Sequence, residues 1–379
     1  MRCLRGAFGI ICEIIGAYPG GSISLEVLFM ATKVAINGLG RIGRTVLRCW
    51  VARRFKDVEI VALNNLIPPE DMAYYVKYDS THGKAPFEVK ADSESLILDG
   101  IRIPMFVEKD PVALPWKKLG VDIVLECTGR FTKKPDAMKH VEAGARHVII
   151  SAPADGVDRM IVLGVNEKDF DPKADIVVSN ASCTTNSLAA VTKVMHETFG
   201  IENLMATTIH AYTATQFLVD TPRKGGGRRG RAAGVSLVPA TTGAAKAMVP
   251  LFPDLKGKMD MIAVRVPTVD GSLTDANFLL KKTVTLDEVN GALKKAAEGP
   301  LKGIVEFCEE EIVSVDIIGN PHSCIVDSLS TKVLDGRLVK LMLWYDNEFG
   351  YSNQVIRIVE EIAGVRPAVL PRRKELSEL

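Results

Sequence analysis

The sequence lacks the features that mark membrane proteins, nucleic-acid-binding proteins and metal-stabilised domains. Its 47 basic and 46 acidic side chains leave a net charge of +1, so no global field favours nucleic acid or an anionic membrane surface. No stretch reaches the ~18 uninterrupted apolar residues that a membrane helix requires. The seven cysteines are scattered, without a CxxC pair or a histidine cluster at metal-ligand spacing. We therefore expect a cytoplasmic protein with no membrane span and no structural metal.

The first 29 residues differ in character from the rest. An apolar run over residues 6–18, interrupted by Glu13 and preceded by two arginines, resembles a poor signal or transit segment. The alternative is that translation starts at Met30, immediately before the first good strand. On either interpretation, residues 1–29 are predicted to be an extension that is not part of the fold.

The length of 379 residues and the hydrophobic content of 47% predict two domains. Up to about residue 180, apolar runs alternate with stretches of helical periodicity, which is typical of βαβ units and a parallel sheet. Strands are expected at residues 33–37, 58–63, 122–126, 147–151 and 176–179, and helices at residues 41–54 and 135–143.

Beyond residue 200 the strands become longer and helices fewer, which favours an antiparallel sheet with one covered face. These strands are expected at residues 204–209, 261–267, 275–281 and 339–345, and an amphipathic helix over residues 349–362 could return to either sheet. The predicted fold class is α/β, with a Rossmann-type doubly wound dinucleotide-binding domain and an α+β catalytic domain whose sheet is mostly antiparallel. The first domain is assigned residues 30–180 and 347–364, the second residues 181–346, and a polar tail residues 365–379.

A G-x-G-x-x-G run, formed by Gly38, Gly40 and Gly43, closes the first expected strand and opens the first expected helix. In that context the motif indicates dinucleotide binding. Gly38 would make the tight turn, Gly40 would let the backbone approach a pyrophosphate, and Gly43 would let helix and sheet pack closely. The alternative is a plain glycine turn between strand and helix.

The end of the second strand carries no acid. An Asp or Glu there would bind the adenine ribose of NAD and repel the additional phosphate of NADP, but this place holds Asn64 and Asn65. The sequence therefore predicts NAD as cofactor without excluding NADP. No arginine follows Asn65 closely, so a phosphate on the ribose is not expected to be required.

Cys183 has the surroundings of a nucleophile. It lies in a hydroxyl-rich run over residues 179–186, between an expected strand and an expected helix over residues 187–199. A helix N-terminus favours the thiolate through its dipole and its free N–H groups. We predict a reactive thiol at this position. The alternative, a buried small apolar side chain, is kept for the other six cysteines.

A thiolate that attacks a carbonyl needs a group that moves protons, and imidazole suits this role because its reference pKa is about 6.5. His210 is the best placed of the six histidines, since it ends an apolar strand and is followed by hydroxyl-bearing residues. His82 is its competitor. The remaining histidines, expected to be ordinary surface groups, are His140, His147, His196 and His322.

Six motifs, in order along the chain, resemble those of the phosphorylating glyceraldehyde-3-phosphate dehydrogenase family. The most characteristic is the active-site signature Ala-Ser-Cys-Thr-Thr-Asn at residues 181–186. The others lie at residues 36–44, 77–83, 241–246, 265–268 and 344–353, so the resemblance covers residues 31 to about 364.

The resemblance implies oxidation of D-glyceraldehyde 3-phosphate with NAD and inorganic phosphate to 1,3-bisphosphoglycerate, in glycolysis or gluconeogenesis, by a homotetramer. It makes Cys183 the nucleophile and His210 the general base. The cofactor contacts that it implies, besides the three glycines and Asn65, are Arg41, Ile42, Thr128, Gly129, Ser151 and Asn347. The residues that it assigns to the two phosphates are Ser182, Thr184, Thr213, Arg229, Thr242, Gly243 and Arg265, with Arg228 and Arg231 as alternatives to Arg229.

Four departures from the family pattern bear on cofactor choice and substrate fit. Asn65 replaces the usual Asp, Lys109 an Arg, and Ser187 a second Cys, while residues 269–274 replace a stretch that usually begins Pro-Asn. One rival enzyme is an erythrose-4-phosphate dehydrogenase. Another is a Cys/His hydrolase or acyltransferase, and an enzyme of that class would not need the glycine loop. A non-catalytic RNA- or surface-binding role rests on the basic run at residues 223–231, which lacks the interleaved aromatic residues that stack bases.

Overall fold

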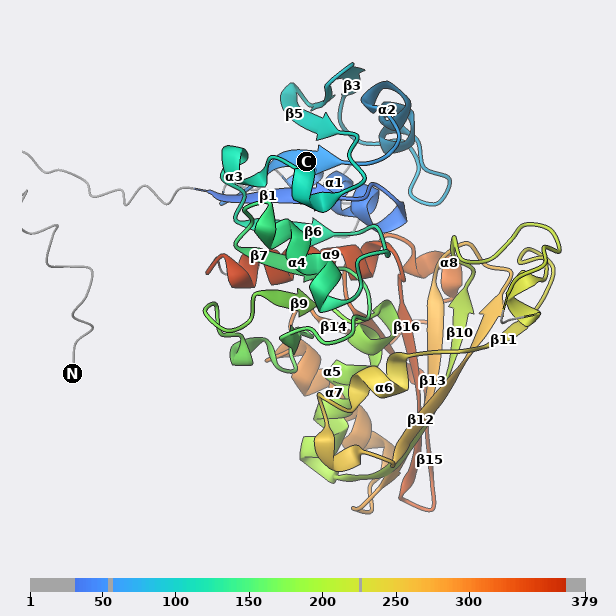
Figure 1. The fold of residues 1–379 in the computed structure, drawn as a ribbon. Helices are drawn as coiled ribbons and strands as arrows, with labels where there is room; N and C mark the ends of the chain where they lie inside the picture. Colours follow the sequence, from blue (N-terminus) through green and yellow to red (C-terminus); the bar gives the residue numbers. More distant parts are fainter. Residues whose placement is uncertain (1–30, 54–56, 225–226, 366–379) are drawn as a thin grey trace, which may run out of the picture. The chain divides into compact units, whose positions relative to one another are not determined.

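A computed structural model describes residues 31–53, 57–224 and 227–365. The extension predicted for residues 1–29 and the tail beyond Val365 lie outside the described residues. Within residues 31–365 the strands form two sheets with helices packed against them (Figure 1). In the described part of the chain no helix is both long and apolar enough to span a bilayer.

The first sheet has nine strands in the order β3-β4-β5-β2-β1-β6-β7-β9-β8. Its central strands run parallel, whereas β3, β4 and β5 form antiparallel hairpins at one edge. The strands are β1 (Thr32–Asn37), β2 (Val58–Asn64), β3 (Val89–Asp92), β4 (Ser95–Leu98), β5 (Ile101–Phe106), β6 (Ile123–Glu126), β7 (His147–Ile150), β8 (Arg159–Met160) and β9 (Val177–Ser179). The helices between them are α1 (Arg41–Arg53), α2 (Pro69–Lys77), α3 (Trp116–Leu119) and α4 (Lys134–Glu142).

The central strands form because their apolar residues are buried on both faces. Val34 to Asn37 of β1 and all four residues of β6 are buried, as expected for parallel strands covered by helices. Trp50 of α1 fixes the helix to β2 by donating from Nε1 to the carbonyl oxygen of Val58, at 2.9 Å. The doubly wound fold predicted from the sequence is confirmed, with strand limits that differ by one or two residues.

The second sheet has seven strands in the order β11-β12-β10-β13-β16-β15-β14 and is mostly antiparallel, as predicted, with parallel pairing only between β10 and β12 and between β14 and β15. Helices α5, α6 and α7 contact its strands. The strands are β10 (Ile201–Ala211), β11 (Val238–Thr241), β12 (Met259–Val266), β13 (Ser272–Leu280), β14 (Val305–Cys308), β15 (Cys324–Leu334) and β16 (Leu338–Tyr345). The helices are α5 (Cys183–Phe199), α6 (Ala244–Met248), α7 (Leu286–Glu298) and α8 (Ser314–Ile317).

The last helix, α9 (Phe349–Ile362), packs against α1 beside the first sheet (Figure 1). Its first twelve residues are all buried, so it contributes a large apolar area to the core. This answers the question that the sequence left open, namely which sheet the helix joins. The proposed division into residues 30–180 with 347–364 and residues 181–346 stays a prediction.

The expectation that Cys183 lies at or near a helix N-terminus is confirmed: the helix expected over residues 187–199 begins four residues earlier, at Cys183, with Ser182 as its N-cap. One expectation about local structure was wrong. His140, expected on the surface, is fully buried. Its Nδ1 accepts a hydrogen bond from Trp116 Nε1 at 3.0 Å, and its Nε2 lies 3.2 Å from Glu126 Oε2.

Candidate active site

A cavity of about 380 Å³ opens where β1, β2 and β6 of the first sheet end. Four of the residues predicted to bind a cofactor line it, namely Gly38, Gly40, Asn65 and Thr128. The carboxyl ends of parallel strands are where doubly wound sheets bind nucleotides. The further lining residues are Asn37, Asn64, Leu66, Ile67, Glu108, Lys109, Cys127, Arg130 and Phe131.

The three motif glycines serve different purposes in this loop. Gly38 has a φ of +97°, which side chains rarely adopt, and a Cβ there would lie 2.7 Å from the Thr128 nitrogen. A Cβ on Gly43 would lie 1.9 Å from the carbonyl oxygen of Gly38, so Gly43 is required by packing. Gly40 has no atom within 4 Å of its would-be Cβ. The space above Gly40 is therefore open to a ligand, which fits the approach of a pyrophosphate.

Asn65 faces the cavity directly after β2. Its Oδ1 accepts a hydrogen bond from the Leu39 N–H at 3.2 Å and thereby holds the glycine loop. Lys109, named above as a departure from the family pattern, and Arg130 line the same cavity. The sequence did not place either cation near Asn65, because other loops bring them in from more than forty residues further along the chain.

Glu126, at the end of β6, organises the other side of the cavity. It is buried, accepts hydrogen bonds from Asn37 Nδ2 at 2.6 Å and from the Thr128 N–H at 2.8 Å, and also bonds the Thr128 hydroxyl. The Ser151 hydroxyl donates to the Glu126 carbonyl oxygen, at 3.1 Å. Thr128 therefore lines the cavity, whereas Ser151 is not among its lining residues. Gly129 lies between the lining residues 128 and 130 and has a φ of +68°.

Arg41 and Ile42 lie at the start of α1, but their side chains are engaged elsewhere. Arg41 forms ion pairs with Asp79 and Glu348, and the partly buried Ile42 packs against the core. Only the backbone of these two residues, at the N-terminus of the helix, is available to an anionic ligand.

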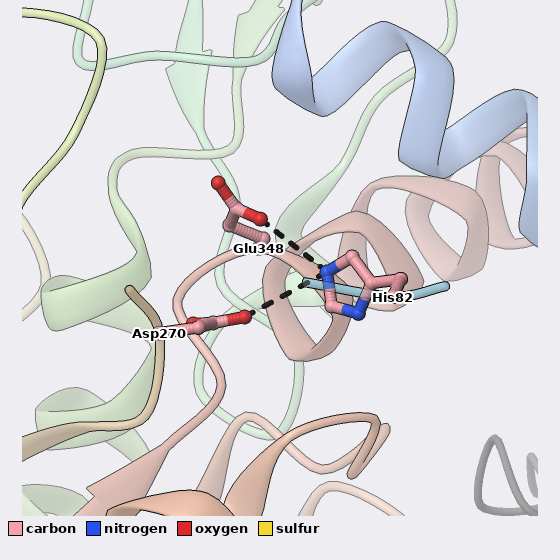
Figure 2. Close-up of side chains that lie close together, drawn as sticks. All are labelled: His82, Asp270 and Glu348. Atoms are coloured by element: carbon pink, nitrogen blue, oxygen red, sulfur yellow. Dashed lines mark ion pairs between the residues drawn. The ribbon is translucent and has the colours of Figure 1, made fainter. Parts of the chain in front are cut away.

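Figure 2 shows His82 facing two carboxylates. Its Nε2 lies 3.3 Å from Glu348 Oε2 and 3.6 Å from Asp270 Oδ2, a spacing that could hold a cation. However, Arg41 bonds both oxygens of Glu348. Burial, together with the charges of Asp346 and Glu348, raises the pKa of Asp270 well above its usual value and so favours its neutral form. We therefore interpret His82, Asp270 and Glu348 as side chains that balance charge within the protein rather than as ligands of a cation.

The chain turns sharply before the nucleophile. Ala181 has a φ of +55°, in the left-handed region that residues with a Cβ rarely adopt. Its carbonyl oxygen accepts a hydrogen bond from the Tyr351 hydroxyl at 3.2 Å, and Asn186 Nδ2 donates to the carbonyl oxygens of Asn180 and Ser182. The turn is thereby held in place, and α5 begins at Cys183.

Cys183 and His210 come together, as predicted. The Sγ of Cys183 lies 3.4 Å from Nε2 of His210, which sits near the end of β10. The Tyr345 ring packs edge-on against the imidazole, with ring centroids 5.9 Å apart. His82 makes no hydrogen bond to Cys183 in the described structure and is therefore not the proton-transferring partner there.

The helix start favours the thiolate form of Cys183, but burial acts in the opposite direction. Burial raises the pKa of the Cys183 thiol to about 11, although Arg265 and the hydrogen bonds of Thr184 act to lower it. Burial and then the charge of Arg265 lower the pKa of His210 to about 3. Both shifts favour the uncharged pair, a thiol and an imidazole.

One arginine approaches the pair from the second sheet. Nη1 of Arg265, on β12, lies 2.6 Å from His210 Nδ1 and donates to the Ala211 carbonyl oxygen at 3.0 Å. Burial lowers the pKa of Arg265, and the charge of Arg229, in the segment before β11, acts in the same direction. A buried guanidinium on which a second positive charge acts is suited to binding an anion.

The hydroxyl groups assigned to phosphate binding are only partly available. Thr213, half-buried, contacts Thr215 Oγ1 at 2.9 Å, and Thr242, next to Gly243 at the start of α6, accepts a hydrogen bond from the Ala244 N–H. The Ser182 hydroxyl, by contrast, caps α5 by accepting from the Thr185 N–H at 3.1 Å.

Thr184 is buried, and its Oγ1 lies 2.9 Å from the Tyr345 hydroxyl, which also lies 2.7 Å from Thr208 Oγ1. Sequence reasoning missed Tyr345 and Thr208. Alternate residues of β16 are buried, so the alternation expected of a strand could have placed Tyr345 on the buried face.

Comparison with known proteins gives two family matches. Residues 32–134 match the model described as "Glyceraldehyde 3-phosphate dehydrogenase, NAD binding domain", and residues 182–347 match "Glyceraldehyde 3-phosphate dehydrogenase, C-terminal domain". The chain is 52% identical over 334 residues to a glyceraldehyde-3-phosphate dehydrogenase of Geobacillus stearothermophilus, covering 88% of this chain and 99% of the relative. It is 51% identical to glyceraldehyde-3-phosphate dehydrogenase 1 of Bacillus subtilis, with the same coverage, and 47% identical over 330 residues to a relative from Chlamydia pneumoniae, covering 87% and 98%.

We predict that alanine at Gly40 and at Gly43 weakens NAD binding for different reasons. Gly43→Ala forces a methyl group into the Gly38 carbonyl and should lower stability by about 1–3 kcal/mol. Gly40→Ala meets no protein atom and should keep the wild-type melting temperature while lowering NAD affinity. Thermal unfolding without NAD and titration calorimetry with NAD measure the two effects. Undiminished affinity in the Gly40 variant would contradict the assignment of this loop.

Proposed function

Because the chain belongs to the glyceraldehyde-3-phosphate dehydrogenase family, we propose that its Cys183 and His210 oxidise D-glyceraldehyde 3-phosphate with NAD and inorganic phosphate to 1,3-bisphosphoglycerate. The family comprises NAD-dependent oxidoreductases that act on an aldehyde. The observation that carries the proposal is the 3.4 Å contact between Cys183 Sγ and His210 Nε2, beside Arg265 and at the start of α5.

The first step needs a nucleophilic sulfur and a proton acceptor. Since the resting pair is uncharged, His210 Nε2 takes the thiol proton as Cys183 Sγ bonds to the aldehyde carbon. The negative charge then moves to the substrate oxygen. The Cys183 N–H, at the helix start, and the protonated Nε2 are the donors available to it.

The second step removes a hydride from the carbon bound to sulfur. His210 first returns the thiol proton to the substrate oxygen, which becomes a hydroxyl group, and takes that proton back as the hydride leaves, so that the carbon becomes a thioester of Cys183. When NAD is bound, its nicotinamide supplies the hydride acceptor. Asn347 is oriented for the cofactor, because Ser272 Oγ donates to its Oδ1 at 2.6 Å and Asp270 Oδ1 accepts from its N–H at 3.2 Å.

The last step is attack of inorganic phosphate on the thioester, which releases the acyl phosphate and the Cys183 sulfur. The substrate's own phosphate and the attacking phosphate both require cationic donors. Arg265 lies next to the pair, and Arg229 is near enough for its charge to act on Arg265. The half-buried Thr213 and Thr242 are the further hydroxyl groups that the family resemblance assigns to the phosphates.

Two rival functions are less well supported. An erythrose-4-phosphate dehydrogenase would share Cys183 and His210, but the relatives named above carry the glyceraldehyde-3-phosphate name. An RNA-binding role would need free cations on the basic loop. Instead, Arg223 bonds the Thr215 carbonyl, Arg229 the Thr241 carbonyl, and Arg231 the Asp220 carboxylate.

Cys183→Ser tests the proposed function. We expect turnover of glyceraldehyde 3-phosphate to fall by several orders of magnitude, because a serine hydroxyl is a much weaker nucleophile than the sulfur. NAD affinity should stay close to that of the wild type, since the glycine loop is untouched. Steady-state kinetics and NAD titration measure the two properties. Turnover that persists in this variant would sink the proposal, and a large loss of NAD affinity would count against it.

Cofactor choice is proposed to favour NAD only modestly, by about tenfold, or ~1.4 kcal/mol in transition-state binding. Asn65 is uncharged and does not repel the NADP phosphate, while Lys109 and Arg130 line the same cavity. Asn65→Asp keeps an oxygen for the Leu39 N–H but adds a charge, so we expect NAD selectivity to rise. Lys109→Gln is the matched comparison, expected to weaken NADP use more than NAD use. An unchanged cofactor ratio in Asn65→Asp would show that other residues set the preference.

The proposed assembly is a homotetramer. Between β10 and β11, the described residues Leu218, Val219, Val235 and Leu237 are 67–85% exposed in the single chain. Exposed apolar side chains of this size favour burial against another protein surface. Light scattering coupled to size exclusion should give four times the chain mass of 41.2 kDa, and a monomeric mass would refute the assembly. The cytoplasmic location stays a prediction, for cell fractionation to test.

A further inference from the structure

His210 Nδ1 has two neighbours that require opposite states of the ring. The Ala211 carbonyl oxygen, 2.7 Å away, can only accept a hydrogen bond, whereas Arg265 Nη1, 2.6 Å away, can only donate one. A neutral imidazole has one N–H and one bare nitrogen, so Nδ1 can satisfy Ala211 or Arg265 but not both.

This conflict follows from the register of the sheet. β10 and β12 run parallel, and His210 is paired with Arg265 in the ladder. The two side chains therefore leave adjacent strands at the same level, near the carboxyl ends. Because the ring is 4% exposed, these two neighbours, rather than bulk water, are the standing hydrogen-bond partners of Nδ1.

The state of Nδ1 determines what the sulfur faces. With Arg265 donating to Nδ1, the ring proton must be on Nε2, and Nε2–H points at Cys183 Sγ, where it cannot accept the thiol proton. With Nδ1–H donating to Ala211, Nε2 is bare and can act as the base. Only the second tautomer performs the proton transfer described above.

We propose that Arg265 is a positioning residue that sets the tautomer of His210, and that an anionic phosphate at Arg265 releases it. The phosphate draws the guanidinium away from Nδ1. One proton then leaves Nε2 for water and another arrives at Nδ1 from water, so the net charge of the ring is unchanged. The Cys–His pair is thereby made ready for proton transfer by the phosphate group of an incoming ligand. This inference rests on the proposed function.

A purely electrostatic role of Arg265 acts on both members of the pair. The Arg265 charge lowers the pKa of Cys183 and also the pKa of His210, so an anion that neutralises it makes the thiol harder to ionise and the imidazole a stronger base. The tautomer of His210, which charge compensation alone does not change, therefore separates the two roles.

The test measures alkylation of Cys183 by iodoacetamide against pH in the full-length, NAD-free protein. One series contains inorganic phosphate, and the other contains potassium chloride at the same ionic strength. We expect phosphate to lower the apparent pKa of alkylation by about one unit, equal to about tenfold in rate below the midpoint. An unchanged or raised apparent pKa in phosphate overturns the proposal.

Arg265→Met removes the donor to Nδ1. In chloride, we expect the apparent pKa of Cys183 alkylation to be lower in this variant than in the wild type. We expect phosphate to cause no further shift in the variant. Arg337→Met is the matched control, because it removes an arginine that bonds Glu202 and the Leu280 carbonyl oxygen rather than His210. It should respond to phosphate as the wild type does. A downward shift in Arg337→Met without phosphate would show that the loss of any arginine charge is enough, and would overturn the proposal.

A second readout observes the tautomer itself. In protein labelled with ¹⁵N-histidine, the His210 resonance, assigned with His210→Asn, should report Nε2–H in chloride and Nδ1–H in phosphate. The same tautomer in both buffers overturns the proposal even if Arg265→Met fails to fold. Neither measurement uses turnover, so failure here is distinguishable from failure of the Cys183→Ser test of the dehydrogenase function.

Discussion

The active site depends on one strained turn, at Ala181. A left-handed conformation costs a residue with a Cβ roughly 1–2 kcal/mol, and Ala181 adopts it fully buried. The hydrogen bond from Tyr351 and the two from Asn186 hold the turn. Because the turn ends immediately before α5, it fixes both the helix start and the direction of Cys183. The sulfur meets a histidine from a different sheet only because this geometry is maintained.

Burial, more than local charge, governs the chemistry of the site. It makes the thiol a weaker acid and the imidazole a weaker base, so the pair rests uncharged. The same burial forces every charged group nearby to find a partner: Arg41 takes Asp79 and Glu348, and Asp270 tends to keep its proton. Reactivity must therefore be produced when ligands arrive, which suits a catalyst that has to protect its nucleophile between turnovers.

The sequence predicted the parts of this protein that are encoded locally. Glycine spacing identified the cofactor loop, and the hydroxyl-rich residues around Cys183 singled out the cysteine that the structure places beside His210, because both motifs act through the backbone next to them. What could not be predicted depends on burial and on distant chain segments. His140 looked like a surface residue, Lys109 and Arg130 came from other loops, and the effect of desolvation on Cys183 outweighed that of the helix start.

The position of α9 at the end of the chain bears on how the protein is made. Tyr351 of this helix bonds the turn at Ala181, and Glu348, its N-cap residue, bonds Arg41 beside the glycine loop. Almost all of the surface of the helix is buried in the core. On the ribosome, where domains fold as they emerge, the first sheet can be built from residues 32–179 long before these contacts exist. The nascent chain therefore carries an incompletely positioned Cys183 until α9 has been synthesised and has packed against α1.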